Sequence, residues 1–257
     1  MKWISFAVFP FALTSCTLPN SSSEYRPDIS VYCVLSPQQD QQILQVYNTT
    51  EELRFSIAPE SLFVKDAEVT IRSGMQMVEL NYAVQTDTSA LGYVTRQQMY
   101  ADTYERLRVI PGESYELSVR IHAELYSGTT KVPGSFDVLS PVPGEKFTPD
   151  ENILLKWQPA KGAAGYLISL YPPPYEVSIT PDSSIFIRYP HIFETDKTEF
   201  IIPPEYIDGS GGYDIVIEGY DENYRRFVYE EEDRSGLDQG YGLFASKSSA
   251  SGFFVVE

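Results

Sequence analysis

The sequence predicts an all-β protein with two tandem antiparallel β-sandwich domains behind an N-terminal leader. Aromatic residues make up 14% of the chain, including 19 tyrosines, and there are 18 prolines and 16 glycines. Aromatic residues favour strands, whereas proline and glycine favour turns. Apolar and polar residues alternate in short segments separated by turns, without helical periodicity between them. Together these observations favour antiparallel sandwiches.

The leader occupies residues 1–15. A basic residue precedes an apolar run from Trp3 to Leu13, which is too short to cross a bilayer as a helix. An aliphatic residue, two small residues and a cysteine end it: Leu13, Thr14, Ser15 and Cys16. This order resembles the lipobox of bacterial lipoproteins. The resemblance implies that the Cys16 thiol is diacylglycerated, that the peptide bond before it is cleaved, and that the new amino terminus is acylated, with fatty acids such as palmitate. Such chains would anchor the protein firmly to a membrane.

Two alternatives use the same residues differently. The segment could be an ordinary cleaved signal peptide with a coincidental cysteine, in which case Cys16 could pair with Cys33, or it could form a buried helix. Its position, length and flanking residues favour the lipobox. Thr17, in place of an aspartate, resembles lipoproteins sorted to an outer membrane; the face on which the protein lies stays open. Residues 16–27 are polar and predict a flexible tether.

The first predicted sandwich covers residues 28–139. From Asp28 onward, alternate residues are apolar and share one face of a strand: Ile29, Val31, Cys33 and Leu35. Cys33 is therefore expected to be buried and inert. The same alternation predicts three further strands: Ile43–Tyr47, Glu68–Arg72 and Tyr115–Tyr126.

The second predicted sandwich covers residues 140–257. Ser140-Pro141-Val142-Pro143-Gly144 interrupts the alternation and marks its start. Predicted strands then follow at Asn152–Gln158, Tyr166–Leu170, Ser184–Tyr189, Glu199–Ile202, Tyr213–Tyr220 and Gly252–Val256. A long inserted loop near 221–240 is expected to carry a helical turn through Tyr224–Glu232.

Two family resemblances follow from these segments. Trp157 with a nearby proline, the Gly-Tyr that opens the next strand, and Tyr213 resemble a fibronectin type III or immunoglobulin-like module over Pro141–Val256. The lipobox, VKDAEVTI, PGESYELSV and GYGLFASKSSASGFFVV resemble a group of uncharacterised cell-envelope lipoproteins of Bacteroidota. The second resemblance implies a transthyretin-like first sandwich and a role near outer-membrane receptors, but no chemistry.

The charge of the chain argues against nucleic acid as a partner. The formal net charge is −17, and it becomes −18 when the leader with Lys2 is removed. Such a surface repels polyphosphates and anionic lipid headgroups.

The residues for catalysis are sparse, and the chain is predicted not to be an enzyme. Its two histidines, His122 and His191, belong to no zinc-protease helix, and no Gly-x-Ser-x-Gly motif is present. The sequence has no cysteines and histidines at the close spacing that zinc sites use. The acidic residues of Asp221–Asp238 could bind calcium, but they lack the EF-hand order and more commonly form a solvated surface. No metal and no cofactor are expected.

Two binding functions remain as hypotheses. The first is a non-catalytic interaction module that docks an envelope protein partner, such as an outer-membrane receptor complex; an exposed apolar patch or an unpaired edge strand would favour it. The alternative is a glycan-binding lipoprotein that assists saccharide capture. Its candidate tyrosines flank loops: Tyr171, Tyr175, Tyr189 and Tyr224. Each of them could equally be a strand-edge tyrosine with its ring in the core.

Overall fold

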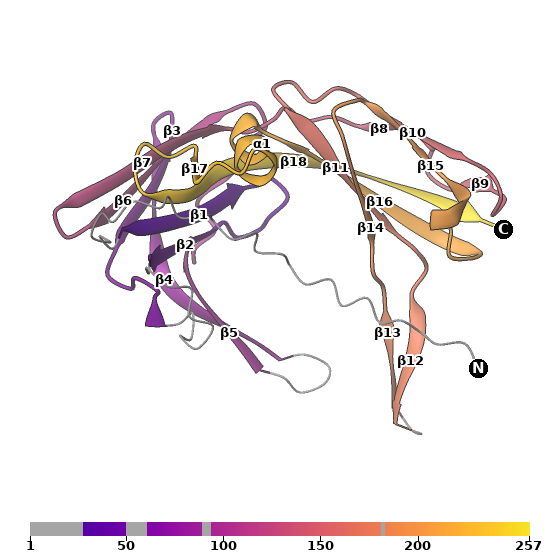
Figure 1. Ribbon diagram of the computed structural model, residues 1–257, viewed down its shortest axis with the longest axis horizontal. Coiled ribbons are helices and arrows are strands. Elements are labelled where there is room, and N and C mark those ends of the chain that lie inside the picture. Colours follow the sequence, from indigo (N-terminus) through magenta and orange to yellow (C-terminus); the bar gives the residue numbers. More distant parts are fainter. Residues whose placement is uncertain (1–27, 50–60, 89–93, 181–182) are drawn as a thin grey trace, which may run out of the picture.

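The computed structural model describes residues 28–49, 61–88, 94–180 and 183–257. Two hydrophobic cores, each enclosed by strands, lie at opposite ends of the molecule (Figure 1). This architecture confirms the predicted all-β, sandwich-like fold. The predicted leader, lipobox and tether, residues 1–27, lie outside the described residues. No helix within the described ranges is long and apolar enough to cross a membrane.

The first core lies between two layers that share strand β4. The strands are β1 (Ile29–Leu35), β2 (Ile43–Asn48), β3 (Glu68–Ser73), β4 (Gln76–Thr88), β5 (Val94–Ala101), β6 (Ser114–Ile121) and β7 (Glu124–Lys131). The first part of β4 pairs with β3 and the rest pairs with β5, so the sheet order runs β1-β2-β5-β4-β3-β6-β7. The predicted alternation in β1 is confirmed, because Ile29, Val31, Cys33 and Leu35 are all buried.

The prediction of a single strand over Tyr115–Tyr126 is wrong. The chain reverses at His122 and Ala123, so β6 and β7 form a hairpin in which Ile121 pairs with Glu124. His122 adopts a positive φ of 53° in this turn. Neither turn residue is glycine or asparagine, the usual signals for such a conformation. The change of register exposes Leu125 and buries Tyr126.

The second core lies between a three-stranded layer and a five-stranded layer. The additional strands are β8 (Val138–Ser140), β9 (Glu145–Phe147), β10 (Ile153–Trp157), β11 (Gly165–Tyr171), β14 (His191–Thr195), β15 (Glu199–Ile202) and β16 (Gly211–Tyr220), with the 3₁₀ helix η2 at Pro204–Tyr206. One layer has the order β15-β10-β8. The other has the order β14-β11-β16-β18-β9, in which β18 covers Tyr241–Val256. Trp157 is buried between them, with its ring 5.3 Å from that of Tyr166.

Strand β18 (Tyr241–Val256) belongs to both cores (Figure 1). Its first part pairs in parallel with β1, and its second part, from Lys247, pairs antiparallel with β16. Helix α1 (Glu222–Tyr229) and β17 (Arg234–Ser235) precede it, and Leu237 and Phe244 belong to the first core. The structure therefore differs from the predicted division at residue 140, because a segment near the C-terminus returns to the first sandwich.

Candidate binding site

A β-ribbon projects from the second sandwich beyond its core. Strands β11 and β14 lead into β12 (Tyr175–Thr180) and β13 (Ser183–Ile187), which extend away from both cores as a hairpin (Figure 1). Pro172–Pro174 and Pro190 lie between the two parts of the ribbon. Because proline has no backbone N–H, the ladder of hydrogen bonds is interrupted there, and β12 and β13 form a separate two-stranded sheet.

The side chain of Arg188 holds this hairpin to the sandwich. Its Nη2 donates a hydrogen bond of 2.7 Å to the carbonyl of Tyr171, and its Nε donates to the carbonyl of Pro172. Its Nη1 lies 2.5 Å from Oδ2 of Asp214 on β16. The guanidinium also lies 5.6 Å from the centre of the Tyr171 ring. Arg188 thus supplies side-chain bonds where the prolines remove backbone ones.

Apolar side chains on this ribbon face solvent. Phe186 is 71% exposed, Tyr189 65% and Ile192 65%, and Tyr175 is exposed as well. An isolated two-stranded ribbon is at best marginally stable in water. A partner that covered these side chains would therefore stabilise the hairpin.

Through β18, strands of both sandwiches form one continuous sheet that runs from β14 at one end to β7 at the other. Its two ends differ in how their edges are protected. At the β7 end, the N–H of Thr129 donates to the carbonyl of Gly236, and the N–H of Asp238 donates to the carbonyl of Ser127. At the other end, β14 pairs with β11 on one side only, and no strand in the described ranges covers its outer edge. An uncovered edge presents backbone N–H and C=O groups to any extended chain.

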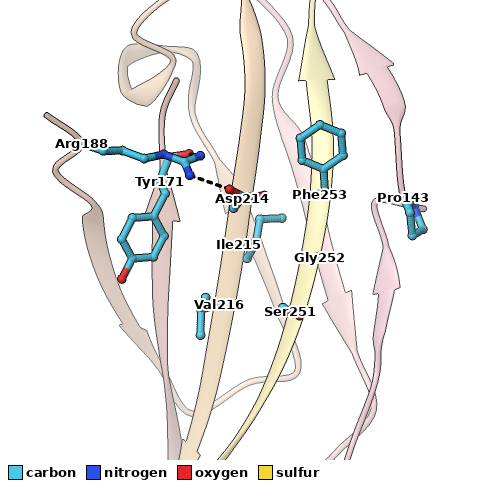
Figure 2. Close-up of a pocket in the computed structure, with 9 residues that line it drawn as sticks. All are labelled: Pro143, Tyr171, Arg188, Asp214, Ile215, Val216, Ser251, Gly252 and Phe253. Atoms are coloured by element: carbon cyan, nitrogen blue, oxygen red, sulfur yellow. Dashed lines mark hydrogen bonds and ion pairs between the residues drawn. The ribbon is translucent and has the colours of Figure 1, made fainter. Parts of the chain in front are cut away.

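A shallow trough of about 590 Å³ lies on the outer face of β11, β16 and β18. Tyr171 and Arg188 stand on one side, Phe253 and Pro143 on the other, and Asp214 lies between them (Figure 2). The remaining lining residues form the floor: Ile215, Val216, Ser251 and Gly252. The trough therefore combines two aromatic borders with an ion pair.

A second hollow, of about 570 Å³, lies beside α1 and is filled by its own interactions. The hydroxyl of Tyr220 donates a 2.6 Å hydrogen bond to Glu194, and burial raises the pKa of Tyr220, so the phenol stays protonated. Arg225 forms ion pairs with Glu222, at 2.6 Å, and with Glu230, at 2.9 Å. The hydrogen bond from Arg225 lowers the pKa of Glu222. These side chains use their hydrogen-bonding and charged groups on one another, so few of those groups are left to bind a ligand.

In the acidic segment Asp221–Asp238, which follows β16, Asp221 is buried and has a structural role. It caps α1, since its Oδ1 accepts a 3.0 Å hydrogen bond from the N–H of Tyr224. Its Oδ2 accepts from Thr130 on β7 and, at 3.2 Å, from Ser246 on β18. Burial raises the pKa of Asp221 despite these hydrogen bonds. This carboxylate joins three elements of the fold.

Other reactive side chains are separated or enclosed. Burial raises the pKa of Cys33 to about 12, so its thiol is not ionised at neutral pH. His122 lies in the β6–β7 turn of the first sandwich, whereas His191 on β14 contacts Asp208 at 3.0 Å in the second. Within the described ranges, no group of three or more histidine, cysteine, aspartate or glutamate residues could hold a metal ion.

The four candidate tyrosines do not form one platform. Tyr171 borders the trough, while Tyr175 and Tyr189 are exposed on the projecting ribbon. Tyr224 lies on α1 with its ring 5.1 Å from that of Tyr220. The candidate lipid-attachment residue Cys16 and its lipobox fall outside the described ranges.

Sequence reasoning missed the residues that complete the trough. Arg188, Asp214 and Phe253 lie in or beside predicted strands, and the alternation places Asp214 and Phe253 on the polar side of theirs. This alternation was the only sign in the sequence that the side chains of Asp214 and Phe253 point away from the core. Bringing the three together depends on strand register, which pairs Asp214 with Phe253.

The profile of a family described as "Domain of unknown function (DUF4249)" matches residues 17–249. No curated protein matches the chain.

Proposed function

This chain belongs to the DUF4249 family, and on that premise we propose that it is a lipid-anchored cell-envelope lipoprotein that acts as a non-catalytic docking module for a protein partner. The observation that carries the docking role is the uncovered edge of β14 beside a ribbon with exposed apolar side chains. Extended chains recognise such an edge by adding a strand, and apolar side chains next to it add affinity and specificity.

The partner that fits this surface is a protein with an extended segment. Backbone groups along β14 would bind its main chain, and Phe186, Tyr189 and Ile192 would cover its apolar side chains. The lipobox at Leu13–Cys16 and the absence of an aspartate at position 17 support an outer-membrane location. An outer-membrane receptor complex is the partner that this location favours.

A charge placed on the edge strand tests docking. Ile192→Lys introduces a lysine beside the open edge, and edge lysines oppose strand addition. Ile201→Lys is the matched control, because Ile201 is 55% exposed on β15 of the opposite layer. The tagged, lipidated proteins would be cross-linked in native membranes and purified, and any recovered partner would be identified and produced in pure form.

Strand addition predicts that the wild type and Ile201→Lys bind the pure partner, while Ile192→Lys binds it much more weakly. Hydrogen exchange should slow at β14 amides when the partner is added. Failure to recover an envelope partner, equal binding by both variants, or unchanged exchange at β14 would contradict the proposal.

The anchor has its own test. In a host that processes lipoproteins, wild-type protein should gain acyl mass at Cys16 and sediment with membranes, whereas Cys16→Ala should do neither. If both proteins are soluble and cleaved elsewhere, the anchor and the envelope location are wrong.

A second candidate function, glycan binding that assists saccharide capture, has support from a different observation. The trough bordered by Tyr171 and Phe253 lies on another surface of the sandwich from the edge of β14.

A further inference from the structure

The trough on the outer face of β11, β16 and β18 has polar groups that the fold does not fully use. The contacts of Arg188 with Tyr171, Pro172 and Asp214 occupy three of its N–H groups, and a guanidinium has more donors than that. Asp214 accepts this bond through Oδ2, while Oδ1 accepts none from the described residues. Donor and acceptor groups thus lie next to each other beside the same trough.

Two further residues that line the trough, Ser251 and Tyr171, carry hydroxyl groups. The hydroxyl of Ser251 on the floor forms no hydrogen bond with the described part of the chain, and neither does the hydroxyl of Tyr171. A ligand that both donates and accepts hydrogen bonds at several closely spaced positions would match this arrangement.

Phe253 gives the trough an apolar face. Its side chain is 38% exposed although phenylalanine is usually buried. A Cβ built on Gly212 would lie 2.7 Å from the Phe253 ring, so the ring packs over the backbone of β16 and is held in place. A fixed, half-exposed ring at the border of a polar trough suits a ligand with an apolar flat side.

Charge decides among the ligand classes. The ion pair of Arg188 and Asp214 is neutral as a unit, so it selects neither an anion nor a cation strongly. The formal net charge of −17 disfavours anions further. A neutral ligand with adjacent hydroxyls and an apolar face meets every requirement.

We infer that this trough binds a neutral saccharide. The sugar stacks on Phe253, and two neighbouring hydroxyls bond the free N–H groups of Arg188 and Oδ1 of Asp214. Tyr171 and Ser251 bond further hydroxyls along the trough. Binding here does not require the docking edge of β14, so either activity can fail without the other.

Two variants of the full chain test the inference. Phe253→Ala removes the stacking face, and Ser251→Gln fills the floor from an exposed position. Tyr104→Ala is the control, since it removes an exposed ring beside the first sandwich. Circular dichroism and thermal unfolding would confirm that each variant is folded.

The proteins would be applied to a glycan array and then titrated by calorimetry with maltohexaose, cellohexaose, xylohexaose, any neutral glycan that the array identifies, and oligogalacturonate as the anionic comparison. At least one neutral glycan should bind, with affinity about tenfold lower in Phe253→Ala and Ser251→Gln and unchanged in Tyr104→Ala. Silence on the array and in calorimetry at millimolar sugar, tighter binding of oligogalacturonate, or binding that neither variant weakens would overturn the inference.

Discussion

At the scale of single residues, Asp221 has the largest structural role among the carboxylates of the acidic segment. It caps α1 and accepts hydrogen bonds from Thr130 and Ser246, which belong to different strands. A run of acidic residues suggests a solvated surface, and Asp221 departs from that pattern because it is buried. Sequence alone did not distinguish it from its exposed neighbours, since burial here follows from long-range packing.

Replacement of Asp221 by alanine should lower the free energy of unfolding by about 2–3 kcal/mol. Loss of the helix cap accounts for roughly 1 kcal/mol, and the buried hydroxyls of Thr130 and Ser246, which still contact each other at 2.9 Å, lose their common acceptor. Urea unfolding at neutral pH measures the change. A loss no larger than that of Asp40→Ala, at an exposed position, would contradict this role.

The raised pKa of Asp221 predicts a pH dependence with a definite sign. The folded state binds the proton more tightly than the unfolded chain does, so stability falls as pH rises from the unfolded pKa through the folded one. Asp221→Asn lacks this titration. Its stability relative to the wild type should therefore increase across that acidic window and then level off. Urea unfolding at a series of pH values, with Asp40→Asn as the control, would reveal a constant difference if the prediction is wrong.

At the scale of elements, the parallel pairing of β18 with β1 depends on one glycine. Gly242 has a φ of +104°, and a Cβ at this position would lie 2.1 Å from the carbonyl oxygen of Val31. Its N–H also donates to the carbonyl of Asp233. The strand can approach β1 this closely because position 242 has no side chain.

Gly242→Ala should therefore lower the free energy of unfolding by more than the backbone strain of a positive φ accounts for. Gly112→Ala is the matched control, since Gly112 has a φ of +84° and nothing within 4 Å of a built Cβ. The control should lose about 1–2 kcal/mol from backbone strain, whereas Gly242→Ala should lose at least ~3 kcal/mol because β1 or β18 must also shift. Similar losses in guanidinium unfolding would show that the close approach is unimportant.

The same physics explains which elements could be predicted from sequence. Strands with one buried face, such as β1, β10 and β16, carry an alternation that is visible locally. The β4–β5 hairpin and strand β12 were not predicted, because much of each extends beyond a core and alternation fades there. Of the β12–β13 pair, only the segment Ser184–Tyr189, which overlaps β13, was predicted as a strand. The trough could not be predicted from the sequence for a related reason, because Arg188 and Asp214 come together only through the pairing of strands that are distant in the chain.

At the scale of the whole molecule, the proline-rich break at Ser140–Gly144 signals the first passage between the cores, but nothing local signals the return. The segment Tyr241–Val256 is one uninterrupted strand, and both cores use it. A fragment that ends at residue 139 would lack the partner of β1 and the buried side chain of Phe244. Division of the chain at the local break therefore separates residues that fold together.

This shared strand predicts that both cores unfold in one transition. In a protein that lacks residues 1–15, Trp157 is the only tryptophan, and it lies in the second core, so its fluorescence reports that core. Ile71→Ala creates a cavity in the first core, where Ile71 is fully buried, and should cost roughly 2–5 kcal/mol. Because unfolding of the first core removes the pairing that orders the start of β18, the Trp157 transition should move to lower denaturant together with the circular dichroism transition. Ile217→Ala, in the second core, provides the matched comparison and should shift both signals equally. If Ile71→Ala moves only part of the circular dichroism signal and leaves the Trp157 midpoint unchanged, the sandwiches unfold independently and β18 does not couple them.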